Sequence, residues 1–192
     1  MKKVGVLALQ GDFEAHGKAV ERAGAQAVYV RTAADLEGLD GLIMPGGEST
    51  TMLKLIRMEN LLEPLAEFGR KKPIFGTCAG AILLAQRVSN PVQESLGLVD
   101  LEIERNAYGR QVDSRVVNLD ADPSFAQRTR PGTLEAVFIR APIIRDVGPK
   151  AKVLAKYDGD PVLVEAGQHL ISTFHPELTA DSRVHELFLS KL

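Results

Sequence analysis

The 192-residue sequence has one cysteine, no tryptophan and no long apolar run. A single cysteine excludes an internal disulfide framework, which removes the main sequence sign of a secreted protein. A membrane-spanning helix needs roughly 20 consecutive apolar residues, and no stretch of the sequence approaches that length. The apolar run after Lys2 and Lys3 ends before Gln10, which is too short for a signal peptide. We therefore expect a cytoplasmic protein without a membrane partner.

A strong charge of either sign is also missing. The 23 basic and 25 acidic residues nearly cancel and leave a formal net charge of -2. This balance gives no electrostatic attraction to nucleic acid or to an anionic membrane. Hydrophobic residues make up 45% of the chain, which is enough for a sizeable core. We expect one compact domain over residues 1–192 and no nucleic-acid partner.

The first half of the chain alternates apolar runs with helical patterns. Residues 3–9, 27–30 and 39–45 are predicted strands, and a helix capped by Asp12 and ending near Arg22 connects the first two. This order is typical of the start of a doubly wound α/β sheet. Further helices are predicted over residues 60–69 and 79–87, on either side of a strand that ends near residue 77.

The second half is richer in strand patterns. A final helix is predicted over residues 183–191, capped by Asp181 or Ser182. The polar, proline-containing stretch 120–132 is typical of a mobile loop. The predicted strands lie within 97–119, over 135–142, and in a β-meander over 151–157, 162–165 and 170–174 with a hairpin turn at Asp158-Gly159.

The lone cysteine lies between an apolar strand and a helix, within the sequence Gly-Thr-Cys-Ala-Gly at residues 76–80. A cysteine taken alone is more often a buried core residue than a reactive one. Here the flanking glycines match a nucleophile elbow, in which a tight strand-to-helix turn lifts the side chain out of the sheet. The turn also puts the thiol at a helix N-terminus, where the dipole favours the thiolate. Cys78 is therefore a candidate nucleophile.

A second glycine-rich turn, Pro45-Gly46-Gly47, follows another predicted strand. Ligands of open α/β sheets bind where parallel strands end, so this loop is expected beside the elbow. Two glycines leave backbone N–H groups open to an oxyanion. A Gly-Gly pair alone is a weak signal, because most such pairs are only tight turns.

A thiol nucleophile needs a base, and the chain has four histidines. His175 follows the last predicted strand and therefore lies at the same sheet edge as Cys78. Glu177 is two residues further on, past a stiffening proline, and can orient the imidazole. The one cysteine and scattered histidines lack the spacing of a metal site, so no metal is predicted.

These motifs resemble the class I, triad-type glutamine amidotransferase family. The resemblance covers essentially the whole chain, and within the family it is strongest to the glutaminase subunits of pyridoxal 5′-phosphate synthases. Ala81 is a departure, since a larger apolar residue is usual there. The blocks that carry the resemblance are residues 6–13, 45–50, 76–80, 105–111 (Arg-Asn-Ala-Tyr-Gly-Arg-Gln), 138–142 (Phe-Ile-Arg-Ala-Pro) and 173–178.

The resemblance implies a flavodoxin-like three-layer sandwich, with a mostly parallel central sheet and an added antiparallel β-section. It implies hydrolysis of L-glutamine to L-glutamate and ammonia by Cys78, His175 and Glu177, without a cofactor. The oxyanion would be held by N–H groups of Ala79 and of Gly46 or Gly47. The implied substrate-binding residues are Gly47, Glu48, Ser49, Arg105, Ile139 and Arg140.

The resemblance also implies a partner, a (β/α)8-barrel synthase subunit that receives the ammonia. Gln10 ends the first strand on the same sheet edge, and we hypothesise that it couples docking of this subunit to the Gly46-Gly47 loop. The alternatives are a cysteine hydrolase or chaperone-like protein of the DJ-1/PfpI type, the glutaminase subunit of another amidotransferase, and a non-catalytic module with the same fold. The His-Pro-Glu sequence at 175–177 argues against the first of these, and the complete triad argues against the last.

Overall fold

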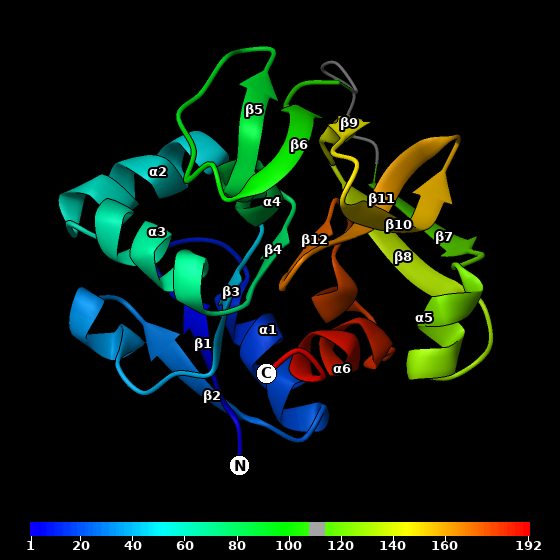
Figure 1. The fold of residues 1–192 in the computed structure, drawn as a ribbon, viewed down its shortest axis with the longest axis horizontal. Helices are drawn as coiled ribbons and strands as arrows, with labels where there is room; N and C mark the ends of the chain where they lie inside the picture. The colour runs from blue at the N-terminus through cyan, green and yellow to red at the C-terminus, as the bar shows by residue number, and fades with distance from the viewer. Residues whose placement is uncertain (108–113) are drawn as a thin grey trace.

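The computed structural model describes residues 1–107 and 114–192 (Figure 1). Its strands are β1 (Lys3–Leu7), β2 (Gln26–Val30), β3 (Gly41–Met44), β4 (Ile74–Thr77), β5 (Ala85–Ser89), β6 (Val99–Glu104), β7 (Ser114–Leu119), β8 (Leu134–Ile139), β9 (Ile143–Val147), β10 (Ala151–Tyr157), β11 (Asp160–Ala166) and β12 (His169–Ser172). Its helices are α1 (Phe13–Arg22), α2 (Ser49–Met58), α3 (Leu62–Lys71), α4 (Ala79–Leu84), α5 (Pro123–Arg128) and α6 (Arg183–Leu189), with short 3₁₀ helices η1 (Ala33–Leu36) and η2 (Pro176–Leu178).

The largest sheet among the described residues has seven strands in the order β10-β11-β12-β4-β3-β1-β2. The five strands from β12 to β2 are parallel, and β11 and β10 extend the sheet antiparallel. Read along the chain, the parallel strands have the 2-1-3-4-5 order of flavodoxin-like folds. The predicted mostly parallel sheet with an antiparallel section is confirmed, as is the turn at Asp158-Gly159, where both residues have positive φ.

Helices and small sheets cover the two faces of this sheet and complete a three-layer sandwich (Figure 1). Successive strand residues point to opposite faces, so Ile74 and Phe75 of β4 belong to two different hydrophobic clusters. One cluster packs under α2, α3 and the three-stranded sheet β5-β6-β9. The other packs under α1, α6, α5 and the two-stranded sheet β7-β8. Burial on both faces explains why the central strands are apolar throughout.

The helix after the elbow is shorter than the sequence predicts. We expected it to continue to residue 87, but α4 ends at Leu84 and β5 begins at Ala85. The carbonyls of Leu83 and Leu84 accept hydrogen bonds from the N–H groups of Leu96 and Leu98. The chain then pairs with β6, which is tertiary context that outweighs the helix propensity of this segment.

The expectation of a mobile loop over residues 120–132 is wrong for residues 123–128, because these residues form α5. Asp122 caps this helix by accepting from the N–H of Ser124 at 2.9 Å, and Phe125 is fully buried. Arg183 of α6 then donates to the carbonyls of residues 130, 132 and 133 at 2.6–3.1 Å. A single buried guanidinium therefore ties the end of this segment to α6.

Of the two helix caps that the sequence predicts, the one at α1 is absent and the one at α6 is confirmed. Asp12 precedes α1, but its side chain makes no capping hydrogen bond. At α6 the capping acceptor is Asp181, whose carboxylate accepts from the N–H of Arg183 at 3.0 Å, whereas Ser182 does not cap. In the part of the chain that the structure describes, no helix is long and apolar enough to cross a membrane.

Candidate active site

Cys78 occupies a sharp elbow between β4 and α4. Its backbone has φ 49° and ψ −105°, a conformation that costs energy for any residue with a side chain. Its N–H donates to the carbonyl of Ser172 at 2.9 Å, which ties the elbow to β12. A Cβ at Gly80 would lie 1.9 Å from the carbonyl oxygen of Met44, and one at Gly76 would lie 2.8 Å from the backbone of Gly80. Both flanking positions must therefore be glycine, as the elbow motif predicts.

His175 reaches the elbow from the next parallel strand. It lies after β12, and its N–H donates to the carbonyl of Val137 at 2.8 Å. Its Nδ1 is 2.7 Å from Oε1 of Glu177, and both residues are buried. The imidazole and Cys78 line the same cavity, and both pack against Gly46. The structure thus brings together the three side chains that the sequence singles out as nucleophile, base and orienting acid.

The electrostatics of this cluster favour a charged imidazole. Burial by itself would lower the pKa of His175. Hydrogen bonds with Cys78 and Glu177 and the attraction of these groups outweigh burial and raise the pKa of His175 to about 10. An imidazolium beside the sulfur stabilises a thiolate, which is the nucleophilic form of cysteine.

The Gly46-Gly47 loop packs directly on this cluster. A Cβ at Gly46 would lie 2.5 Å from Cε1 of His175 and 3.3 Å from Cβ of Cys78, so only glycine fits. Gly47 has φ 147°. Ala79 begins α4 directly after Cys78, and N–H groups in the first turn of a helix have no partner within it. The three residues predicted to form an oxyanion hole therefore all lie at the elbow.

The β1–α1 turn packs against the Gly46-Gly47 loop. Oε1 of Gln10 accepts from the N–H of Glu48 at 3.1 Å. A Cβ at Gly11 would lie 1.8 Å from the carbonyl oxygen of Gly46, so this close contact depends on glycine. Any movement of the turn therefore acts on the loop that contacts His175.

A cavity of about 500 Å³ opens in front of Cys78 and His175. All six predicted substrate-binding residues line it, so the structure gathers them from three separate parts of the chain. Sequence reasoning missed Ile82 and Asn106 as lining residues, and it assigned Gln10 to the partner surface only. Ile82 was detectable, because it follows Cys78 by four residues and thus shares its helix face. Of the polar block 105–111, residues 108–111 lie outside the described residues.

Glu48 and Arg105 form one wall of the cavity. The Glu48 carboxylate caps α2 by accepting from the N–H groups of Thr50 and Thr51 at 3.1 and 2.7 Å. Burial would raise the pKa of Glu48, but a hydrogen bond from the Thr51 hydroxyl together with these two backbone bonds lowers the pKa below its usual value. Arg105 donates to Oγ1 of Thr50 at 2.7 Å and lies 3.9 Å from Glu48. Arg105 is therefore held in place at the cavity as a cation.

The last two predicted substrate residues lie at the end of β8. Ile139 is half-buried, and Arg140 is exposed with φ 45°. Ser49, on the opposite side, is buried and its hydroxyl donates to Gln93 at 3.2 Å. Among the residues that the structure describes, no group of three or more His, Cys, Asp or Glu side chains is placed to hold a metal ion.

Comparison with known proteins agrees with this geometry. The model of the SNO glutamine amidotransferase family matches residues 6–192, and the chain belongs to this family. A protein of Solibacter usitatus (strain Ellin6076) named pyridoxal 5′-phosphate synthase subunit PdxT is 67% identical to it over the full length of both chains. A protein of the same name from Koribacter versatilis (strain Ellin345) is 52% identical over 97% of this chain and 94% of its own.

Two solved structures are also similar to this chain over nearly its whole length. One described as a glutamine amidotransferase is 46% identical and superposes with a TM-score of 0.88, covering 98% of this chain and 97% of its own. The structure of PurLQS from Thermotoga maritima, at 17% identity, superposes with a TM-score of 0.78 over 98% of both chains. At that identity the second match supports the fold alone.

Proposed function

We propose that this chain is the glutaminase subunit of a pyridoxal 5′-phosphate synthase and hydrolyses L-glutamine to L-glutamate and ammonia. The observation that carries the proposal is that Cys78 and His175 line one cavity of about 500 Å³, with the buried Glu177 hydrogen-bonded to His175. A cavity of this size exceeds what a single amino acid fills and leaves room for the departing ammonia.

The reaction follows from the positions of these groups. The Cys78 thiolate attacks the side-chain amide carbon of glutamine, and the imidazolium of His175 protonates the nitrogen that leaves as ammonia. A water molecule, deprotonated by His175, then hydrolyses the resulting thioester and releases glutamate. Glu177 holds His175 in one tautomer and stabilises its charged form throughout.

The negative oxygen that forms during both attacks needs hydrogen-bond donors. The N–H of Ala79 and one from Gly46 or Gly47 are the donors nearest to the elbow, and the loss of one such donor typically costs roughly 3–4 kcal/mol of barrier. Arg105, largely buried at the cavity wall, is the cation suited to the α-carboxylate of glutamine. Backbone groups of Gly47, Glu48, Ser49, Ile139 and Arg140 orient the rest of the amino acid.

The ammonia passes to a partner, a (β/α)8-barrel synthase subunit, and the present chain needs no cofactor for its own step. Gln10 and Gly11 are suited to sense this partner, because they contact the loop that carries two oxyanion-hole residues. A Gln10→Ala variant is expected to lose synthase-stimulated glutaminase activity. Unchanged binding and stimulation in this variant would exclude the coupling role. A cytoplasmic location is proposed as well, since Cys78 must stay a free thiol.

The proposed function is tested by measuring glutamate release from glutamine with and without the synthase subunit. We expect activity in the wild type and a loss of roughly 10⁴-fold or more in Cys78→Ala, as for other covalent nucleophiles. A glutamine analogue that carries an electrophile should add once to the wild type, because the chain has one cysteine. Absence of glutamate release under both conditions would favour a thiol enzyme of another class.

A further inference from the structure

Two buried histidines lie behind the triad, on the side of Glu177 that faces away from His175. His16 of α1 and His185 of α6 are 0% and 1% exposed. Nε2 of His16 is 3.3 Å from Oε2 of Glu177 and 3.1 Å from Oγ1 of Thr77, the residue before the nucleophile. Nδ1 of His16 is 3.0 Å from Nε2 of His185. The chain of contacts therefore runs from Cys78 through His175, Glu177 and His16 to His185.

The hydrogen-bond partners of the ring nitrogens select one tautomer for each of these two histidines. Nδ1 of His185 is buried and has no hydrogen-bond partner. A buried N–H without an acceptor is costlier than an unused lone pair, so the His185 proton is on Nε2 and is donated to Nδ1 of His16. His16 then carries its own proton on Nε2, which faces the carboxylate of Glu177. The opposite assignment would place a lone pair of His16 against a carboxylate oxygen.

We infer that His16 is a positioning residue of the triad. Its Nε2–H is shared between Oγ1 of Thr77 and Oε2 of Glu177 and holds that carboxylate against His175, while His185 fixes the tautomer of His16. Oε1 of Glu177 is paired with His175, whereas Oε2 is buried without a hydrogen bond of good geometry. Nε2 of His16 lies 3.3 Å from this oxygen and 3.1 Å from Oγ1 of Thr77. A buried carboxylate needs its oxygens paired, or it adopts other positions. This role rests on the proposed glutaminase activity.

Both histidines are suited to this role because they stay neutral. Burial, followed by repulsion from His185 and His175, lowers the pKa of His16 well below its usual value. Burial, followed by the charge of Arg22, lowers the pKa of His185 to about 3. The negative charge of Glu177 is therefore opposed by one imidazolium only, that of His175. His16 supplies a hydrogen bond to the carboxylate without competing as a second cation.

The sharpest test compares two amides at position 16. A glutamine places its NH₂ group close to the position of Nε2 and can still donate to Glu177. An asparagine reaches only the position of Nδ1, next to His185. We expect His16→Gln to keep kcat of the synthase-bound enzyme within about threefold and His16→Asn to lower it roughly 10- to 100-fold, which is typical when an outer hydrogen-bond partner of a functional group is lost. KM should change little in both, and the alkaline limb of the kcat/KM profile should move to lower pH in His16→Asn.

A matched control is available at the other end of β4. His169 is buried, and its Nδ1 accepts from the N–H of Ile74 at 3.1 Å, at the opposite end of β4 from Thr77. His169→Gln should lower the unfolding temperature without shifting the pH profile. Equal kcat losses in His16→Gln and His16→Asn, or no loss in either, would overturn the positioning role. A wild type that releases no glutamate with its synthase would instead overturn the proposed function.

A second measurement does not depend on the folding of any variant. The nitrogen chemical shifts of ¹⁵N-histidine-labelled wild-type protein report which ring nitrogen carries the proton. We expect His16 and His185 to be neutral and protonated at Nε2 at neutral pH. Protonation of either ring at Nδ1 instead would contradict the inferred direction of the hydrogen-bond chain.

Discussion

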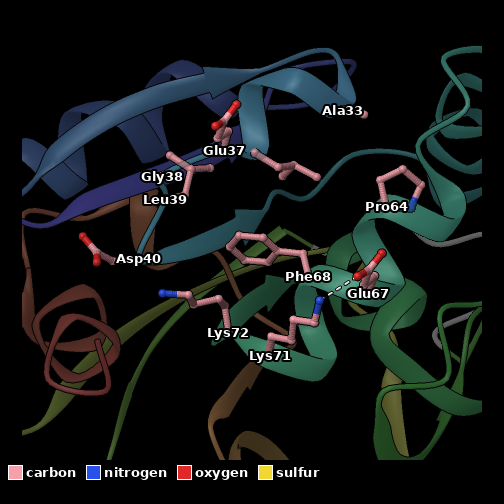
Figure 2. Close-up of a pocket in the computed structure, with 11 residues that line it drawn as sticks. Ala33, Glu37, Gly38, Leu39, Asp40, Pro64, Glu67, Phe68, Lys71 and Lys72 are labelled. Carbon is pink, nitrogen blue, oxygen red and sulfur yellow. Dashed lines mark hydrogen bonds and ion pairs between the residues drawn. The ribbon is translucent and has the colours of Figure 1, made fainter.

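Two cavities of nearly equal size lie at opposite ends of the parallel strands. The one at the carboxyl ends holds Cys78 and measures about 500 Å³. The other measures about 470 Å³ and lies between α3 and the segment from η1 to β3, where Asp40 and Lys72 precede their strands (Figure 2). We call it the amino-end groove. Volume therefore does not distinguish a candidate active site from a surface groove in this protein.

The two cavities differ in the burial and pairing of their polar side chains. In the amino-end groove, Lys71 pairs with Glu67 at 2.6 Å, as Figure 2 shows, and Asp40 accepts from the N–H of Lys3 at 2.8 Å. These charges are exposed and satisfied by close neighbours. At the carboxyl ends, parallel strands bring residues distant in sequence to one place, and a buried carboxylate, an imidazole and a thiol face one another. Convergence of buried ionisable groups, rather than space, marks the functional end of the sheet.

Among the variants that compare the two cavities, Glu177→Gln is expected to lose the most activity. Loss of the carboxylate should lower kcat roughly 10³- to 10⁴-fold, as when an amide replaces the acid of a triad. The pKa of His175, raised to about 10, should fall towards its usual value. The stabilising contribution of the pair is complete below the usual histidine pKa and disappears as pH rises through about 10. At neutral pH the wild type should therefore be more stable than the variant, and this difference should disappear as the pH rises through about 10. Thermal unfolding of both proteins from pH 6 to 11 measures it. Glu67→Gln in the amino-end groove is the control and should change neither kcat nor this dependence.

Gly46→Ala is expected to have the next largest effect. The added methyl group would lie 2.5 Å from Cε1 of His175 and must displace the ring or the loop. A displacement of about 1 Å typically costs roughly 100-fold in rate. Gly38→Ala is the matched control in the amino-end groove, because it also adds a methyl group but has no atom within 4 Å of it. The control should lose about 1 kcal/mol of stability through its positive φ and keep full activity. Full activity in Gly46→Ala would show that the loop does not confine His175.

A smaller effect is expected from Arg105→Ala. Removal of a charged hydrogen-bond donor to the substrate carboxylate typically costs about 1.5–3 kcal/mol, which should raise KM for glutamine roughly 10- to 100-fold with little change in kcat. Steady-state kinetics with the synthase subunit present measure this. Lys71→Ala removes a cation from the amino-end groove and should leave KM unchanged. An unchanged KM in Arg105→Ala would assign the carboxylate to another group.

Phe68→Ala, in the amino-end groove, should have the smallest effect on activity. Phe68 is half-buried and packs on the hydrophobic cluster under α3. Its truncation should lower the free energy of unfolding by about 1–2 kcal/mol in proportion to the apolar area lost. Denaturant unfolding measures this change, and glutamate release should stay at the wild-type rate. A fall in kcat with unaltered stability would mean that the groove takes part in function.

Sequence patterns predicted the parallel half of the fold well, because each strand there is a short apolar run followed by a glycine-rich or polar segment. The elbow and His175 were predictable from local sequence, since the chemistry demands glycine beside Cys78 and places the base at a strand end. The strand β9 was not predicted, and neither was the end of α4 at Leu84. Both depend on pairing with β6, a contact between distant segments that no local pattern encodes.

The contacts of His16 and His185 behind the triad were also not predictable from local sequence. His16 lies in the middle of a helix and His185 lies on the last helix, so neither has a local pattern that indicates a role. Their meeting depends on α1 and α6 covering the same face of the sheet. Arg183 is a similar case, because its carbonyl partners are about 50 residues away in the sequence.

The hydrogen bond from Cys78 to Ser172 also determines how the site responds to thermal fluctuation. The amide joins β4 to β12, in the interior of a seven-stranded sheet. Hydrogen-bonded amides of core strands exchange with deuterium through openings whose free energy approaches that of global unfolding. We therefore expect the Cys78 amide to exchange slowly compared with amides of the surface loops. We expect the position of the nucleophile to survive fluctuations that open the surface loops, because its backbone is joined to two interior strands of the sheet.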